Sequence, residues 1–295
     1  MGGTSHMGHA ARVKSAAPTI DVLAVRTPTL PPATHTNTFL VGTGQAVLVE
    51  PATPYQDEQD VMVDWVGSAR ARGVDPIAIL ATHHHPDHVG GAIALCDRLG
   101  LPLWGHAMTA QRLTGIVELD RLLEDGERIE LDGPTKTALT AIHTPGHAPG
   151  HLCFVDEASG IMIAGDMVAS VGTIIVEPTD GDMILYLESL RRMVSLEPVA
   201  LLPAHGDLIE DPQAILSFYI AHRLMREGKV LGALEAHGEA ASPNDLVARA
   251  YDDTPEALWP LALRSLEAHL IKLEREGRIS REGDRWAPLR LTQSS

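Results

Sequence analysis

Four histidines and one aspartate fall within six consecutive positions of this chain, His83-His84-His85-Pro86-Asp87-His88. The apolar run that precedes them, residues 77–81, predicts a short buried strand, so the cluster comes directly after a strand end. Alternate side chains of an extended segment share one face, which lets His83 and His85 meet the same ion. A helix that begins at the proline would turn Asp87 and His88 toward a second ion. Imidazole and carboxylate groups suit zinc, manganese or iron, so the cluster indicates a metal site.

Three further candidate ligands follow the ends of other predicted strands, and a glycine adjoins each of them: His147, Asp166 and His205. Glycine lets the backbone approach a site closely. Any one of these residues alone would be typical of a hydrogen-bonded histidine or a turn aspartate. The ordered set, with every member at a strand end, indicates a shared metal centre instead. His143 and His151 flank His147 and are either structural or partners that hold ligands in one tautomer.

The sequence over residues 20–207 is rich in strands, with helices interspersed. Apolar patterning predicts strands at 20–26, 38–49 (with a hairpin turn at 42–44), 77–81, 128–131, 136–142, 151–155, 161–164 and 199–202. Helical spacing predicts helices at about 57–72, 90–99 and 181–195. The early strands lack helical crossovers, so a four-layer α+β sandwich, with helices outside two sheets, fits better than a parallel doubly wound sheet.

The pattern changes after Asp211-Pro212. Helices predicted at about 212–236, 244–250 and 255–277, followed by a hairpin at 278–287, outline a winged helix-turn-helix. We therefore predict three parts: a disordered leader or tag over 1–15, a sandwich domain over 16–211 and a winged-helix-like domain over 212–295. The opening MGGTSHMGH is typical of an expression leader, and its two histidines are left out of the site.

The charge and apolar content limit the partners of the chain. With 39 acidic and 23 basic residues, its formal charge of −16 repels polyanions and disfavours a broad nucleic-acid or anionic-membrane surface. Residues 211–295 hold 11 basic and 13 acidic residues, so most of the acidity belongs to the first part. No apolar run reaches the roughly 20 residues of a membrane helix. The two cysteines, Cys96 and Cys153, form no CxxC motif and fit a reducing compartment, so we expect a cytoplasmic protein.

Together these residues resemble the metallo-beta-lactamase superfamily, whose binuclear hydrolases share a His-x-His-x-Asp-His motif, a TPGH segment, a Gly-Asp pair and a late His-Gly pair. All four occur here, at 83–88, 144–147, 165–166 and 205–206. The resemblance implies an αββα sandwich that holds two metal ions. It assigns the first ion to His83, His85 and His147, the second to Asp87, His88 and His205, and a bridging position to Asp166.

Other segments look like the beta-lactamase-like protein 2 group, whose members append a winged-helix domain to the hydrolase. They are residues 36–42 (TNTFLVG), 180–190, 221–223 (AHR) and 270–279. One known member of that group is a mitochondrial endoribonuclease. The chain departs from the family at Glu50-Pro51, where a strand-end aspartate is usual.

The resemblance and the ligand set predict a metal-dependent hydrolase with two divalent ions, zinc being the expected metal. Two ions about 3.5–4 Å apart can share a hydroxide and lower the pKa of its parent water toward neutrality. They also polarise the substrate oxygen and stabilise developing negative charge. Asp87 is the candidate to orient or deprotonate the attacking water. The expected substrate is a small molecule with an ester, thioester or related bond.

Three alternatives accompany this prediction. A phosphodiesterase that cleaves single-stranded RNA gains some support from the stretch 264–290, which has 7 basic and 5 acidic residues. An iron oxidoreductase is disfavoured, because the oxygen-reductase pattern of the superfamily has glutamate where His85 stands. A DNA-binding protein without enzymatic activity is disfavoured by the intact ligand set. We expect the C-terminal domain to shape access to the site, because its near-neutral charge would neutralise few phosphates.

Overall fold

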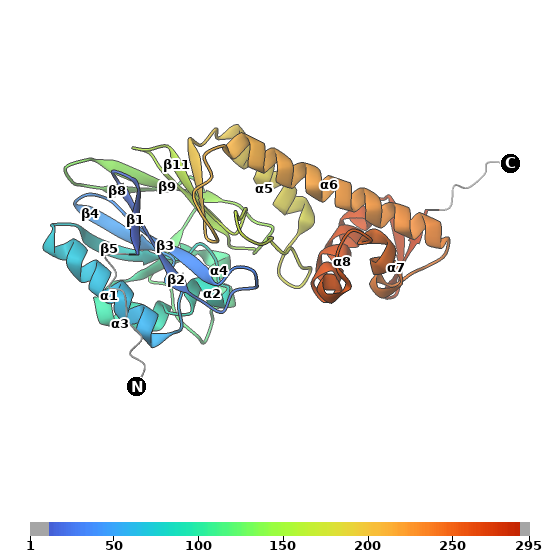
Figure 1. Ribbon diagram of the computed structural model, residues 1–295, viewed down its shortest axis with the longest axis horizontal. Coiled ribbons are helices and arrows are strands. Elements are labelled where there is room, and N and C mark those ends of the chain that lie inside the picture. The colour runs from blue at the N-terminus through green and yellow to red at the C-terminus, as the bar shows by residue number, and fades with distance from the viewer. Residues whose placement is uncertain (1–11, 290–295) are drawn as a thin grey trace. The chain divides into compact units, whose positions relative to one another are not determined.

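The computed structural model describes residues 12–289, which form two compact units (Figure 1). The first unit contains the chain up to Thr144, Gly150–Ile174 and Leu196–Gln213. The second contains Pro145–Pro149, Ile175–Ser195 and the chain from Ala214 onward. The segments 145–149 and 175–195 therefore belong with the C-terminal part of the chain, whereas the sequence predicted two domains that simply follow one another.

A seven-stranded sheet of the first unit runs in sequence order from β1 to β7. Its strands are β1 (Val13–Ala17), β2 (Ile20–Arg26), β3 (His35–Val41), β4 (Gln45–Val49), β5 (Asp75–Leu80), β6 (Leu103–His106) and β7 (Arg121–Leu123). The first four are antiparallel neighbours, and β4 to β7 are parallel. Parallel neighbours need crossovers, which here contain α1 (Gln56–Ala71), α2 (Pro86–Val89), α3 (Ala92–Leu99) and α4 (Ala107–Arg112).

A five-stranded sheet completes the first unit in the order β12-β11-β10-β9-β8. Its strands are β8 (Arg128–Leu131), β9 (Thr137–His143), β10 (Leu152–Asp156), β11 (Ile161–Gly165) and β12 (Ala200–Pro203). Neighbours from β8 to β11 are antiparallel, and β11 and β12 are parallel. The parallel pair brings the carboxyl ends of two strands to one edge of the sheet.

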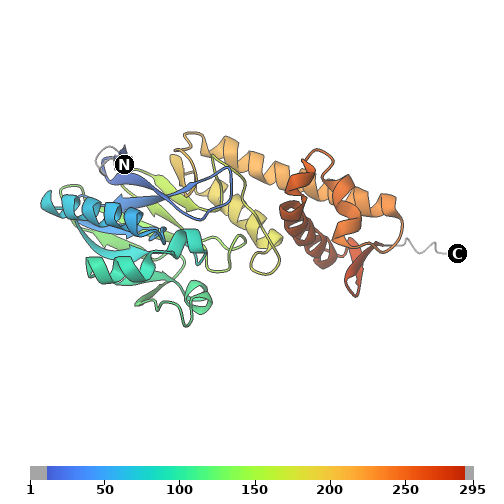
Figure 2. The same ribbon diagram turned by 60° about the horizontal axis from the view of Figure 1, so that its bottom comes forward.

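Alternation along the strands separates two apolar cores in the first unit. Phe39 and Val49 belong to the core between the two sheets, which also contains Phe154 of β10. Leu40 belongs to the other core, where α1 and α3 cover the outer face of the seven-stranded sheet through side chains such as Trp65. Figures 1 and 2 show both helices on this face. In the first unit, one core thus lies between the two sheets and the other between the seven-stranded sheet and its helices.

The second unit is helical, apart from one hairpin. It contains α5 (Met183–Ser195), α6 (Pro212–His237) from Ala214 onward, α7 (Pro243–Ala250), the 3-10 turn η2 (Glu256–Leu258), α8 (Trp259–Arg275), β13 (Ile279–Glu282) and β14 (Arg285–Pro288). Leu266, Leu270 and Leu273 of α8 pack with Trp286 of the hairpin and with α6 and α7. These three leucines join the core as expected, whereas Leu261 is half-buried outside it.

The structure adds elements that the sequence patterns did not reveal: β1, β6, β7 and α4. Two of these have only three or four residues, too short for a periodic pattern. The short helix α2 begins at Pro86, where the ligand argument had placed a helix start. The predicted end of a leader at residue 15 is wrong, because Val13 to Ala17 pair with β2; residues 1–11 of that predicted leader lie outside the described residues. Within residues 12–289, none of the helices is long and apolar enough to cross a membrane.

Candidate metal centre

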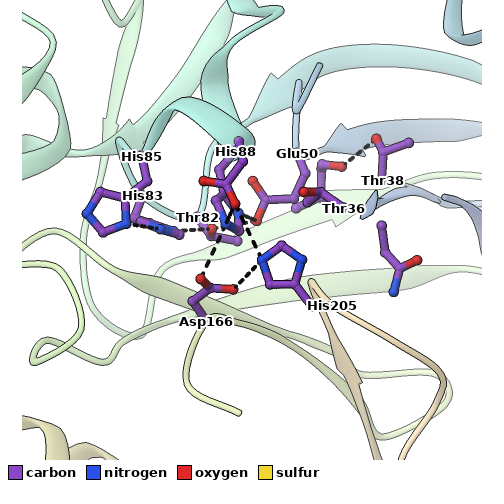
Figure 3. A network of polar contacts seen from close by, with 12 residues as sticks. Thr36, Thr38, Glu50, Thr82, His83, His85, His88, Asp166 and His205 are labelled. Atoms are coloured by element: carbon purple, nitrogen blue, oxygen red, sulfur yellow. Dashed lines mark hydrogen bonds and ion pairs between the residues drawn. The ribbon is translucent and has the colours of Figure 1, made fainter. Parts of the chain in front are cut away.

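The ends of four strands bring Glu50 and six of the seven predicted ligands together in the first unit. Glu50 follows β4, and the histidine cluster follows its parallel neighbour β5. Asp166 and His205 follow the parallel pair β11 and β12. Figure 3 shows His83, His88, Asp166 and His205 converging across the gap between the two sheets. Six of the seven predicted ligands belong to this unit: His83, His85, Asp87, His88, Asp166 and His205.

Asp87, His88 and His205 form one cluster, in which the potential ligand atoms lie within 4.8 Å of one another. The Nε2 atoms of His88 and His205 lie 3.5 and 3.4 Å from the two carboxylate oxygens of Asp166. They lie 3.7 and 3.5 Å from Oδ2 of Asp87. These separations exceed the roughly 2.9 Å of an N–H···O hydrogen bond. They resemble the roughly 3.3 Å between two ligands of one tetrahedral zinc ion with bonds of about 2 Å.

His83 and His85 form a second pair beside this cluster. Nε2 of His83 lies 3.0 Å from Nδ1 of His85, at the distance of a hydrogen bond between the two rings. Ring centroids of His83 and His88 are 4.1 Å apart, so the pair adjoins the first cluster. The arrangement provides two neighbouring groups of donors, as a binuclear site requires.

Glu50 supports one histidine of each group, His88 directly and His83 through the Thr82 hydroxyl. Its Oε1 accepts hydrogen bonds from the Thr82 hydroxyl (2.5 Å) and from Nδ1 of His88 (3.1 Å). The Thr82 hydroxyl in turn accepts from Nδ1 of His83 at 2.9 Å. Glu50 is fully buried, and its φ of 68° lies in the left-handed region. Glu50 therefore contacts His88 directly and His83 through Thr82, and it holds the rings of both groups of candidate ligands in place.

Backbone carbonyls set the tautomers of two further histidines. Nδ1 of His205 lies 3.0 Å from the carbonyl oxygen of His35, and Nδ1 of His147 lies 2.8 Å from that of Ile175. A carbonyl can only accept, so each Nδ1 carries the proton. Each Nε2 then presents a lone pair, the form that binds a metal ion.

His147 lies in Pro145–Pro149, a loop that belongs to the second unit. The backbone N–H of Asp182 donates to the carbonyl of Gly146 at 2.8 Å. The Ser189 hydroxyl donates to the Pro145 carbonyl at 2.7 Å. Gly146 has a φ of 132°, and a Cβ there would come within 2.2 Å of the Tyr186 nitrogen, so this close approach requires glycine. The loop is thereby held on α5, and the role of His147 as a ligand stays a prediction.

His151 supports the backbone next to Asp166. Its Nε2 accepts from the Asp166 N–H at 3.0 Å, which leaves Nδ1 to donate to the Thr144 hydroxyl at 2.8 Å. A Cβ on Gly165 would lie 2.5 Å from His151 Nε2, so glycine is needed beside the aspartate. Both ring nitrogens are thus committed, and His151 is a partner of the site and not a ligand.

His143 lies outside this network and stacks on His106, with ring centroids 4.1 Å apart and planes at 14°. Burial, followed by the neighbouring His143, lowers the pKa of His106 to about 4. The His106 ring is therefore neutral near pH 7.

Three supporting groups escaped the sequence reasoning: the Thr82 hydroxyl and the carbonyls of His35 and Ile175. Thr82 could have been suspected from its place between the strand end and the first histidine. Every residue has a backbone carbonyl, so the residue types could not identify the carbonyls of His35 and Ile175.

The charges of the site favour a bound cation. Burial alone would lower the pKa of His88, but Asp166, Asp87 and Glu50 raise it well above its ordinary value. Burial would likewise raise the pKa of Asp166, but His88 and His205 hold it well below its usual range. Clustered carboxylates therefore stabilise positive charge here, as protons or as metal ions. Donor types, spacing and charge all fit divalent metal ions.

Comparisons with known proteins agree with this geometry. Residues 31–205 match the family described as the metallo-beta-lactamase superfamily, and residues 242–286 match the beta-lactamase associated winged helix domain. The chain is similar to a beta-lactamase-like protein 2 homolog of Drosophila melanogaster, with 29% identity over 84% of this chain and 86% of that protein. It is also similar to an atrochrysone carboxyl ACP thioesterase of Emericella nidulans, with 28% identity over 84% of this chain and 76% of that protein.

A solved structure shows the same fold. The crystal structure of a beta-lactamase domain protein from Burkholderia ambifaria aligns with a TM-score of 0.80 at 23% identity, over 97% of this chain and 96% of that one. The expected αββα sandwich with a C-terminal winged helix is confirmed. So is the resemblance to the beta-lactamase-like protein 2 group. The chain belongs to the metallo-beta-lactamase superfamily and is one of its metal-dependent hydrolases, with an associated winged-helix domain.

Proposed function

We propose that this protein is a binuclear, zinc-dependent hydrolase of acyl thioesters in the cytoplasm. The observation that carries the proposal is the meeting of Asp87, His88, Asp166 and His205, whose facing atoms lie at ligand-to-ligand spacing. Beside this cluster, His83 and His85 would hold a first ion together with His147, and Asp166 would bridge the two ions.

The residues of the chain would then divide the work. Two bound ions supply water activation near neutral pH and polarisation of the substrate carbonyl. Asp87 lies 3.5 Å from His205 through its Oδ2, and its carboxylate would orient the attacking water and accept its proton. Glu50 and His151 keep the ligands from rotating through the hydrogen bonds described above. No serine or cysteine nucleophile is needed.

Two observations support a thioester as the substrate: the name of a relative and the charges of the second unit. The relative from Emericella nidulans is named for thioester hydrolysis. Five cations of the stretch 264–290 are already paired with carboxylates: Arg264 with Glu177, Lys272 and Arg278 with Glu227, Arg275 with Asp182, and Arg285 with Asp245. Paired cations gain little from phosphate contact, because few counterions are released. A small acyl thioester therefore fits better than single-stranded RNA.

The test compares three substrates on protein loaded with two equivalents of zinc. An acyl thioester, the oxygen ester of the same acyl group and a single-stranded RNA are supplied separately, and product formation is measured. We expect kcat/KM for the thioester to exceed that for either alternative by at least about tenfold, a difference of about 1.4 kcal/mol in barrier. RNA cleavage without thioester hydrolysis would overturn the proposal.

A further inference from the structure

The winged-helix part of the second unit is tied to the loop that carries His147. The tie consists of two ion pairs from α8. Arg275 binds Oδ2 of Asp182 through Nη1, and Arg264 binds Oε2 of Glu177 through Nη1 at 2.8 Å. Both carboxylates belong to Ile175–Asp182, the segment that leads into α5.

Asp182 links α8 to the His147 loop with three separate groups. Its Oδ1 caps α5 by accepting from the N–H of Ile184 at 2.8 Å. Its Oδ2 is the oxygen bound by Arg275. Its backbone N–H donates to the carbonyl of Gly146, the residue before His147. A displacement of Asp182 would therefore be transmitted to the loop.

Glu177 provides a second link, through the carbonyl that orients the His147 ring. Ile175, whose carbonyl accepts from Nδ1 of His147 at 2.8 Å, lies two residues before Glu177. The Glu177 carbonyl closes a turn by accepting from the N–H of Gly181 at 2.6 Å. Arg264 therefore anchors the turn from which the carbonyl of Ile175 is presented.

We propose that Arg264 and Arg275 are positioning residues for His147, the proposed metal ligand that the second unit carries. The inference rests on the proposed function, because it takes His147 as a ligand. Neither arginine touches substrate or metal in this scheme. Each acts through the segment that holds the His147 loop and ring, and a ligand held less firmly binds its ion less tightly.

The experiment measures zinc affinity of the full-length protein by competition with a chromophoric chelator. Arg264→Glu and Arg275→Gln should each weaken one of the two zinc equivalents about three- to fivefold, a range suited to exposed ion pairs. The other equivalent should stay unchanged. The double variant Arg264→Glu with Glu177→Arg restores the pair in reverse and should regain the affinity to within about twofold of the wild type.

Arg128→Gln is the matched control, since Arg128 makes an exposed two-bond pair with Glu157 at 2.7 and 2.8 Å in the first unit. It should leave both equivalents unchanged. Wild-type affinity in both α8 variants, or equal weakening of both equivalents together with a lower Tm, would overturn the inference while leaving the proposed function standing. A wild-type protein that binds no zinc would overturn both.

Discussion

His88 and His269 are both fully buried, yet their surroundings are opposite. His88, in the first unit, donates to Glu50 and faces two more carboxylates, which raise its pKa well above the ordinary value. His269, on α8 of the second unit, has no hydrogen-bond partner for either ring nitrogen among the described residues. Burial and then the cations Arg223 and Lys272 hold its pKa well below the ordinary value.

The comparison shows that burial of a histidine does not by itself indicate a ligand. Carboxylates around His88 favour a positive charge, so the ring attracts a proton or a metal ion. Cations around His269 favour the neutral ring, and the role of this ring is then to fill buried space beside polar side chains. The sign of the surrounding charge therefore separates a candidate ligand from a structural histidine.

The largest effect is expected from Asp166→Ala, which removes the carboxylate that faces both His88 and His205. Because partners that only support a ligand are typically worth 10- to 100-fold in metal affinity or activity, loss of a direct ligand should lower hydrolysis by more than about 100-fold. Metal content measured by mass spectrometry should fall in parallel. Asp207→Ala is a suitable control, since this exposed side chain pairs with the exposed Lys14. Two retained metals with full activity would rule out a bridging role.

A smaller effect is expected from Glu50→Gln, which keeps an acceptor for Thr82 and His88 but removes the negative charge. Zinc affinity should fall by about tenfold, the lower end of the range for groups that orient a ligand. Loss of a charge behind both groups of ligands should weaken both zinc equivalents, as seen by chelator competition. Wild-type affinity for both equivalents would show that the charge of Glu50 is unimportant.

The smallest effect is expected from His269→Leu in the second unit. An unfolded histidine titrates near pH 6.5, whereas the pKa of folded His269 is well below that. The unfolded chain therefore binds more protons between these two values, so stability falls as the pH drops below about 6.5. Leucine removes this proton site and two unpaired buried nitrogens.

The His269→Leu variant should lose the part of the acid sensitivity that His269 causes and should gain up to about 1–2 kcal/mol in free energy of unfolding at pH 7. Chemical denaturation at pH 7 and pH 5 measures both effects. His237→Gln, at the exposed end of α6, is the control and should leave the pH dependence unchanged. A leucine variant that is less stable at both pH values would show that the His269 ring has an undetected partner.

Sequence patterns predicted most of this architecture because motif order and strand alternation are local properties. The segment 83–88 follows a strand, and parallel neighbours such as β4 and β5 bring their ends to the same edge. The division into units was not predictable, because α5 joins the C-terminal helices through long-range contacts such as Arg275 with Asp182. The carbonyl of Ile175 could not be identified either, since every residue type has a carbonyl.

The backbone of Glu50 has a consequence for how this site can evolve. At a φ of 68°, a residue with a Cβ is strained by roughly 1–2 kcal/mol, whereas glycine is not. Selection for metal binding thus opposes selection for stability at this one position. In relatives of this fold that have lost their metal ligands, the opposition disappears, and glycine or asparagine should replace the acidic residue. The identity of this single residue would then mark which descendants still depend on the metal.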